Sequence, residues 1–356
     1  MRNKNKKTVL RCYGGVPRGF TLIEFMVACS LGLIVLLAIG VTYGTTVRMR
    51  RTAESRVAVQ QDLRNASELI LRDAQMAGSF GCFNMGNLKV KQQQSANGNA
   101  GQGYVVPGTN NKIRIHLDQL GFSGVTVLQP GTYANIVNGF NPTANSEAVV
   151  FAYGLDSTAV SNSGSETVGT AAPELLDAAG KSGPMALSSC SRLYIEAGDL
   201  LTSPSGNKVQ IDTSGLATSA TEDKPESMYL PQTTLSRVQI VLYAVGQGTN
   251  APVQGLYRFT LQPNGRWGNP QLLAPNINLM KTQQIYSGCA ENNSKPSFST
   301  DYNKIKTDNN LPRFSVMPTT MDIRLSVPSK DETYGTFSEY VIRANVRGGN
   351  ICANLS

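Results

Sequence analysis

Residues 20–44 read FTLIEFMVACSLGLIVLLAIGVTYG, and the organisation of the chain follows from this apolar stretch. It contains no charged residue from Phe25 to Tyr43. A helix of about 20 apolar residues is long enough to cross the ~30 Å hydrocarbon core of a membrane. The stretch therefore predicts a membrane-spanning helix close to the N-terminus.

Basic residues are concentrated on one side of this stretch. Before Phe20 there is no acidic residue, and the basic ones are Arg2, Lys4, Lys6, Lys7, Arg11 and Arg18. Set against Arg48, Arg50 and Arg51 after the stretch, this bias predicts a cytoplasmic leader and an exported remainder. A simple secretory signal peptide would end in a small-residue cleavage site after the apolar run, and no convincing one follows.

The leader also explains most of the charge of the chain. The formal net charge is +8, and it falls to +2 when the six basic leader residues are left out. Net charge therefore does not indicate a nucleic-acid partner.

Glu24 is the one residue that a plain membrane anchor does not explain. A carboxylate at the centre of a membrane helix costs roughly 2.5–3.5 kcal/mol on insertion scales, and somewhat less near the interface. Such a residue normally has a partner and a function. The alternative is a tolerated polar side chain that reaches to the interface.

The sequence Gly19-Phe20-Thr21-Leu22-Ile23-Glu24 resembles the cleavage and methylation motif of type IV prepilins and type II secretion pseudopilins. The resemblance implies that a prepilin peptidase cuts between Gly19 and Phe20 and that Phe20 is then N-methylated. It also implies that Glu24 pairs with the N-terminal ammonium of a neighbouring subunit. A buried carboxylate and a buried ammonium offset each other's desolvation cost and fix the axial register of adjacent helices.

An amphipathic helix follows the membrane segment. Apolar residues recur at helical spacing at Val59, Leu63, Ala66, Ile70 and Ala77, which predicts one buried face. Gly78 is a suitable C-terminal stop. The pattern predicts one helix from Phe20 to about Ala77, on the order of 85 Å long at ~1.5 Å per residue.

After Gly78 the pattern changes to that of strands. The predicted strands are Lys112–Leu117, Gly124–Leu128, Ala148–Tyr153, Arg192–Glu196, Lys208–Asp212, Arg237–Val245, Gly255–Gln262, Met321–Val327 and Glu339–Val346. The sixth and seventh of these, and the last two, read as antiparallel hairpins. Gln92–Gly103 and Asp156–Pro184 read as loops.

These patterns predict an α+β, pilin-like fold, with the long helix packed on an antiparallel sheet domain that contains disulfides. The expected parts are a leader that is removed (1–19), a membrane or filament-core half of the helix (20–44), an amphipathic half (45–78) and an exported β-rich head (79–356).

The cysteines fall into two groups. Cys12 lies in the leader and Cys29 in the apolar segment, whereas the exported region contains Cys82, Cys190, Cys289 and Cys352. Four widely spaced cysteines in an exported domain predict two disulfides with three possible pairings, scattered buried thiols being the alternative. No cysteine and histidine spacing typical of zinc is present.

The segment from Leu71 to Cys82, which contains Ala-Gly and Gly-Cys steps, resembles the end of the long helix in PilW-family minor pilins. That resemblance implies bridges 82–190 and 289–352. It also implies a minor pilin that helps to initiate type IV pilus assembly, with twitching motility, adhesion or DNA uptake downstream. Implied partners are other minor pilins, the major pilin, the prepilin peptidase and the inner-membrane assembly platform. The implied location is the inner membrane before assembly and the pilus or cell surface afterwards.

Motifs for catalysis and cofactors are missing from the sequence. The only histidine, His116, has no nucleophile motif beside it, and no phosphate-binding loop or dinucleotide fingerprint is found. The oxygen-rich run from Asp301 to Asn310 lacks EF-hand spacing, and Trp267 reads as a turn residue with a packed or partly exposed ring. We expect no enzyme activity, cofactor or metal.

Three alternatives stay open at this stage. A J-type minor pseudopilin of a type II secretion system would share the leader and Glu24. A membrane-anchored periplasmic enzyme would need a catalytic cluster. An adhesin or DNA-binding tip module would be compatible with the pilin. The absence of proline between Pro17 and Pro107 favours a minor over a major subunit.

Overall fold

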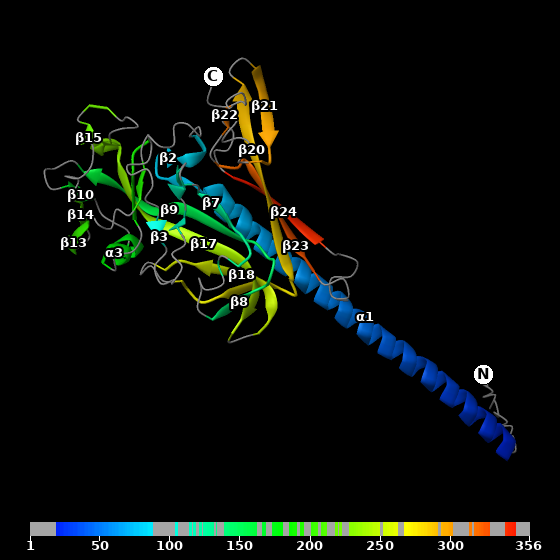
Figure 1. Ribbon diagram of the computed structural model, residues 1–356. Coiled ribbons are helices and arrows are strands. Elements are labelled where there is room, and N and C mark those ends of the chain that lie inside the picture. Colours follow the sequence, from blue (N-terminus) through cyan, green and yellow to red (C-terminus); the bar gives the residue numbers. More distant parts are fainter. Residues whose placement is uncertain are drawn as a thin grey trace, which may run out of the picture. The chain divides into compact units, whose positions relative to one another are not determined.

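In the computed structural model a long helix is followed by antiparallel sheets, which confirms the predicted α+β class (Figure 1). The chain divides into two compact units, residues 1–55 and residues 56–356. The structure describes residues 19–87, 104–105, 114–115, 117–118, 121–122, 124–131, 133, 139–161, 166–168, 173–180, 185–190, 193–195, 201–205, 208–211, 218–219, 221–222, 228–249, 252–262, 267–290, 293–301, 313–314, 317–327 and 339–346.

Helix α1 spans Leu22–Met76, close to the predicted range. In the second unit its apolar stripe is buried as predicted, at Val59, Leu63, Ala66, Ile70 and Ala77. These side chains belong to the same hydrophobic core as residues of both larger sheets. The helix end therefore serves as the central element of the core of the second unit.

Two glycines allow close packing of the backbone where the chain leaves the helix. Gly78 has φ +73°, which favours glycine, and a Cβ there would collide with the sulfur of Met317. Its N–H donates to the carbonyl of Ala152 at 2.8 Å. A Cβ on Gly124 would collide with the backbone of Gly78. The Ala-Gly step seen in the sequence is thus a backbone crossing that admits no side chain.

The largest sheet has 11 strands and runs β12-β11-β17-β9-β10-β14-β13, with β18, β19, β7 and β8 attached to it. All of its pairings are antiparallel. Its strands are β7 (Val125–Leu128), β8 (Phe140–Pro142), β9 (Ala148–Ser161), β10 (Glu166–Val168), β11 (Met185–Ser188), β12 (Leu193–Ile195), β13 (Leu201–Ser205), β14 (Lys208–Ile211), β17 (Thr234–Gly248), β18 (Gln254–Thr260) and β19 (Gln271–Pro275).

Strand β17 organises this sheet. It is 15 residues long and buried along most of its length, because its central run is almost continuously apolar. Along one edge it pairs with β9 and β8, and along the other with β11 and β18. The β17–β18 pairing confirms the first predicted hairpin.

The second large sheet has five strands, and its β23–β24 pairing confirms the second predicted hairpin. Side chains such as Ile323 and Leu325 are buried, whereas Lys281 and Arg324 are exposed, the alternation typical of a sheet covered on one face. Tyr340 contacts Ser67 of α1 through their hydroxyls at 3.1 Å. The strands are β20 (Leu279–Ala290), β21 (Asn293–Ser299), β22 (Arg313–Phe314), β23 (Thr320–Ser326) and β24 (Glu339–Asn345).

The remaining elements are short. They are β1 (Ser79–Phe80), β2 (Phe83–Asn84), η1 (Met85–Asn87), β3 (Tyr104–Val105), β4 (Arg114–Ile115), β5 (Leu117–Asp118), β6 (Gly121–Phe122), α3 (Pro173–Gly180), β15 (Thr218–Ser219), β16 (Met228–Tyr229) and η3 (Leu230–Gln232). The β15–β16 pair is parallel.

The predicted loop at 156–184 is wrong over much of its length. Strand β9 pairs with β17 as far as Ala159 and with β10 as far as Ser161, and α3 follows β10 in the chain. Helix α3 begins with Pro173 and Glu174, which suit the first turn of a helix, and it buries Leu175 and Ala178. The other predicted loop, 92–103, lies outside the described residues.

A buried carboxylate joins the end of α1 to three strands of the large sheet. Asp73 is fully buried. The hydroxyl of Tyr243 donates to its Oδ2 at 2.6 Å, and the hydroxyl of Tyr153 to its Oδ1 at 3.1 Å. Arg258 donates to Oδ2 from Nε and Nη2 at 3.3 and 3.1 Å.

The protonation of the two tyrosines is secured by this environment. Burial raises the pKa of Tyr243, and the negative charge of Asp73 raises it further. The same two causes raise the pKa of Tyr153. Both phenols therefore remain donors at neutral pH, and Asp73 keeps its hydrogen bonds.

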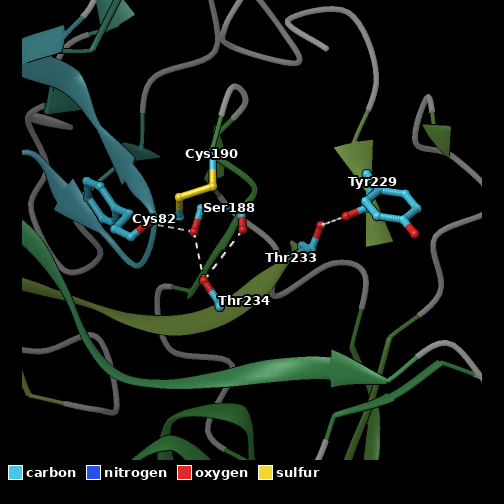
Figure 2. The surroundings of a disulfide bond; sticks show 7 residues. Cys82, Ser188, Cys190, Tyr229, Thr233 and Thr234 are labelled. Atoms are coloured by element: carbon cyan, nitrogen blue, oxygen red, sulfur yellow. Dashed lines mark hydrogen bonds between the residues drawn. A yellow bond between two sulfur atoms is a disulfide. The ribbon is translucent and has the colours of Figure 1, made fainter. Parts of the chain in front are cut away.

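One disulfide is described, between Cys82 and Cys190, which is the pair implied by the family resemblance. Their Cα atoms are 4.7 Å apart. Ser188 and Thr234 lie beside the bridge (Figure 2), and the Ser188 hydroxyl donates to the carbonyl of Phe80 at 2.7 Å. The bridge thus joins the β1–β2 turn to the end of β11. The side chain of Cys289 and the whole of Cys352 lie outside the described residues, so the bridge 289–352 stays a prediction.

Replacing Asp73 should destabilise the fold strongly. Asp73→Ala is expected to lower the free energy of unfolding by roughly 3–5 kcal/mol, because Arg258 and two hydroxyls lose their shared buried acceptor. Urea unfolding of the full chain in mild detergent can be followed by the fluorescence of Trp267, the only tryptophan. Glu68→Ala, at an exposed position of the same helix, should change stability by less than about 0.5 kcal/mol. Equal effects of the two substitutions would contradict this role of Asp73.

Removing the bridge should also cost stability. The cysteines are 108 residues apart, and a loop of that size corresponds to about 4–5 kcal/mol in the chain-entropy model. The double variant Cys82→Ser/Cys190→Ser should therefore unfold at lower urea concentration, and an unchanged midpoint would contradict the prediction. If a reducing agent lowers the stability of this double variant further, that loss would indicate the second predicted bridge, 289–352.

Candidate assembly site at the start of the helix

The three described residues before α1 are exposed and lie outside the helix. Gly19, Phe20 and Thr21 are not helical, and Phe20 is 82% exposed. Exposed backbone outside regular structure is where proteolysis concentrates. The peptide bond between Gly19 and Phe20 therefore lies in a position that a peptidase can reach.

Helix α1 begins with a capping box made by Thr21 and Glu24. The hydroxyl of Thr21 accepts a hydrogen bond from the N–H of Glu24 at 3.4 Å. In return, Glu24 Oε2 accepts from the N–H of Thr21 at 3.2 Å and from its hydroxyl at 3.0 Å. This reciprocal pattern satisfies N–H groups that a helix start otherwise leaves unpaired. Glu24 thus has a local structural role in addition to the one implied by resemblance.

The two carboxylate oxygens of Glu24 are used differently. Oε2 accepts both hydrogen bonds from Thr21. Within the residues that the structure describes, Oε1 accepts none, and the side chain is exposed. One oxygen of the carboxylate therefore remains for a donor from another molecule.

The serine and threonine hydroxyls Ser30, Thr42, Thr45 and Thr46 in the apolar part of α1 donate to carbonyls of the same helix. Ser30 donates to the carbonyl of Val27 at 2.9 Å, and Thr42 to that of Ala38 at 2.8 Å. Thr45 and Thr46 both donate to the carbonyl of Thr42, at 2.9 and 2.7 Å. In a hydrocarbon environment no water can accept these protons. The first part of α1 thus suits a lipid environment in its polar atoms as well as its apolar ones.

The apolar side chains of this part are uncovered. The helix is long and apolar enough to cross a membrane, and its most apolar 18 residues have a mean hydropathy of 2.6 with none of them buried. Large exposed side chains include Leu33, Ile34, Leu36, Leu37 and Ile39. Exposure of this kind marks a surface that a membrane or another helix covers.

Arginines mark the end of the apolar part. Arg50 donates to Glu54 at 2.8 Å. Arg48 and Arg51 are also exposed, and neither forms an ion pair within the residues that the structure describes. Two cations thus lie beside the apolar segment without an ion pair in the described part of the chain, because the nearby Glu54 pairs with Arg50.

The other residues singled out in the sequence are not brought together here. His116 lies outside the described residues, as does all of 301–310 except Asp301. Cys29 is an exposed free thiol on α1. Trp267 is half-buried and forms a β-bridge with Leu261 rather than a simple turn. Its Nε1 has no hydrogen-bond partner in the described part of the chain. The described residues contain no cluster that could hold a metal ion.

Sequence reasoning did not identify Thr21 as a functional neighbour of Glu24. The signal was present, since Thr-x-x-Glu before an apolar run is the spacing of a capping box. It was hidden because the same residues carry the stronger prepilin resemblance.

Comparison with known proteins supports the interpretation of this segment. Residues 17–40 match the family model described as "Prokaryotic N-terminal methylation motif", which includes Gly19, Phe20 and Glu24. The pilin-like protein PilA3 of Thermus thermophilus is 39% identical over 73 residues. That match covers 20% of this chain and 30% of PilA3.

The N-terminal segment of this chain is similar to that of type IV pilin-type proteins. The pilin-type evidence belongs to the N-terminal region, since the family model ends at residue 40. No solved structure matches the chain. The role of the protein and its partners therefore have to be argued from its own residues.

Proposed function

We propose that the chain is a minor pilin of the PilW type that helps to initiate type IV pilus assembly and takes part in the filament. The observation that carries the role in filament assembly is the geometry around Glu24. Its carboxylate caps α1 with one oxygen and leaves the other without a donor in the described chain, five residues after an exposed Gly19. The methylation motif at residues 17–40 supports it.

Cleavage after Gly19 would change the charge at the start of the helix. Phe20 would acquire an ammonium group, and N-methylation keeps that group cationic. A positive charge near a helix N-terminus is unfavourable, because the macrodipole is positive there. A carboxylate in the first turn offsets both the ammonium charge and the positive end of the macrodipole. This is one reason for Glu24 to lie at this position.

Oε1 of Glu24 is the oxygen that we propose for pairing between subunits. In the apolar core of a filament, an ammonium and a carboxylate are each costly alone. The ammonium of one Phe20 and Oε1 of a neighbouring Glu24 satisfy each other, and the pairing sets the axial step between two helices. Glu24 in this proposal is therefore a docking group, held in place by its bonds to Thr21.

The proposed parts of the chain follow from these roles. The leader 1–19 is removed, 20–44 forms the membrane and filament-core half of the helix, 45–78 the amphipathic half and 79–356 the exported head. The partners are the prepilin peptidase, the assembly platform of the inner membrane, the major pilin and other minor pilins. Before assembly the head is periplasmic, and afterwards it lies on the pilus or cell surface.

A minor pseudopilin of a type II secretion system is the second candidate function. It would use Gly19, Phe20 and Glu24 in the same way, so the geometry of the helix start favours neither system. The resemblance of the Leu71–Cys82 segment to PilW-family proteins and the disulfide at Cys82 favour the pilus.

Processing can be tested by mass spectrometry of the mature N-terminus. Protein isolated from membranes of the native host should begin with N-methylated Phe20. An intact Met1, or a cut after the apolar segment, would overturn the proposal. A strain without prepilin peptidase should retain the full leader and serves as the control.

Assembly can be tested by substituting Glu24. Glu24→Val should leave cleavage after Gly19 largely intact. It should lower the amount of the protein in sheared surface filaments by tenfold or more, since the N-terminal ammonium of a neighbouring subunit then lacks its partner. Glu68→Val, a substitution of an exposed glutamate farther along α1, should incorporate normally. Normal incorporation of Glu24→Val would contradict the pairing role.

A strain in which the gene for this chain is deleted can distinguish a pilus from a type II secretion system. If the chain serves a pilus, its deletion should reduce surface filaments and leave the secretion of folded exoproteins unchanged. The opposite pattern would assign it to type II secretion.

A further inference from the structure

We propose that Arg48 and Arg51 form a binding site for the phosphate groups of anionic phospholipids, on the side of the membrane that faces the exported head. The inference rests on the membrane insertion of α1 that the proposed function includes. It does not depend on cleavage, methylation or assembly.

The position of the two arginines follows from the length of the uncharged segment. Phe25 to Val47 contains no charged residue, and as a helix it is about 35 Å long at ~1.5 Å per residue. The hydrocarbon core is about 30 Å thick. When Glu24 lies at one interface, Arg48 and Arg51 therefore lie at the level of the opposite headgroups.

The aromatic residue before them fits the same depth. Tyr43 is 72% exposed on the helix surface. Tyrosine is enriched at membrane interfaces, where its ring is apolar and its hydroxyl is hydrated. It precedes Arg48 by five residues, or about 7.5 Å along the helix.

The arginines need a counter-charge that the described chain does not supply. Spaced three residues apart, Arg48 and Arg51 lie on the same side of the helix, where like charges repel. Arg50 already has Glu54 as its partner, whereas the other two form no ion pair in the described part of the chain. A phosphate between two guanidinium groups removes the repulsion and accepts charge-assisted hydrogen bonds from both.

Lipid selectivity in nanodiscs tests this site. Full-length protein is inserted into nanodiscs that contain equal amounts of phosphatidylglycerol and phosphatidylcholine, and the lipids retained on the released protein are counted by native mass spectrometry. The protein should retain phosphatidylglycerol in excess, and Arg48→Gln/Arg51→Gln should lower that excess by about fivefold for each arginine. Arg64→Gln/Arg324→Gln removes the same charge at two other exposed positions and should retain the excess.

Each outcome has a definite meaning. An equal phosphatidylglycerol excess in the protein and in Arg48→Gln/Arg51→Gln would overturn the lipid site while leaving the membrane helix intact. Equal retention of both lipids by the unmodified protein would overturn it as well, and would favour an acidic side chain of a neighbouring subunit as the partner. Failure to enter the nanodisc would contradict the membrane helix itself, and with it the proposed function.

Discussion

The carboxylate of Asp73 accepts hydrogen bonds from β9, β17 and β18 while it lies in the last turn of α1, and the packing of the helix end depends on it. A negative charge at a helix C-terminus is unfavourable by itself, since the macrodipole is negative there. No basic residue of α1 lies in that turn, and the compensation comes from Arg258 across the interface at 3.1 Å and from Arg72, just before the turn, at 3.6 Å. Burial lowers the pKa of Arg258, but its contacts with Tyr243 and with the carboxylate of Asp73 raise this pKa by more, so the guanidinium stays charged. The interaction thus specifies which face of the helix meets which strands, at a cost that only a correctly packed sheet offsets.

An acidic side chain lies near each end of α1, and the two have different roles. Glu24 lies where the macrodipole favours a negative charge, and it stays exposed, with one oxygen that accepts no hydrogen bond from the described residues. Asp73 lies where the dipole opposes it, and it is buried with both oxygens occupied. A carboxylate with spare capacity is suited to intermolecular pairing, and a saturated one to internal structure.

Much of this fold can be predicted from local patterns. The apolar run and the stripe from Val59 to Ala77 predict α1, and the nearly continuous apolar run around Ile240 predicts β17. Strand β20 escapes prediction because half of its side chains are polar, as in Lys281-Thr282-Gln283-Gln284. Those residues are placed by pairing with β23, which is distant in sequence. Helix α3 is hidden by a region rich in Ser, Gly and Thr, although Pro173 and Glu174 mark its start.

The candidate site also has a part that the sequence predicts and a part that only the structure shows. Gly19, Phe20 and Glu24 form a contiguous motif, so the sequence alone is enough to find them. The capping contact of Thr21 and the unused Oε1 depend on side-chain geometry, which spacing suggests but does not determine. The buried partners of Asp73 lie 80 or more residues away along the chain, and no local pattern indicates them.

The position of the disulfide has a mechanical consequence. Cys82 follows α1 almost directly, and Cys190 lies 108 residues farther along the chain. When a filament is pulled, tension that enters through α1 and leaves through any residue beyond Cys190 is carried covalently across the sulfur bridge. Residues 83–189, which include β9, then form a closed loop that bears none of that tension along its backbone. This segment is thereby protected from extension, and stretching of the head would have to begin in the chain after Cys190, which includes β17 and β18.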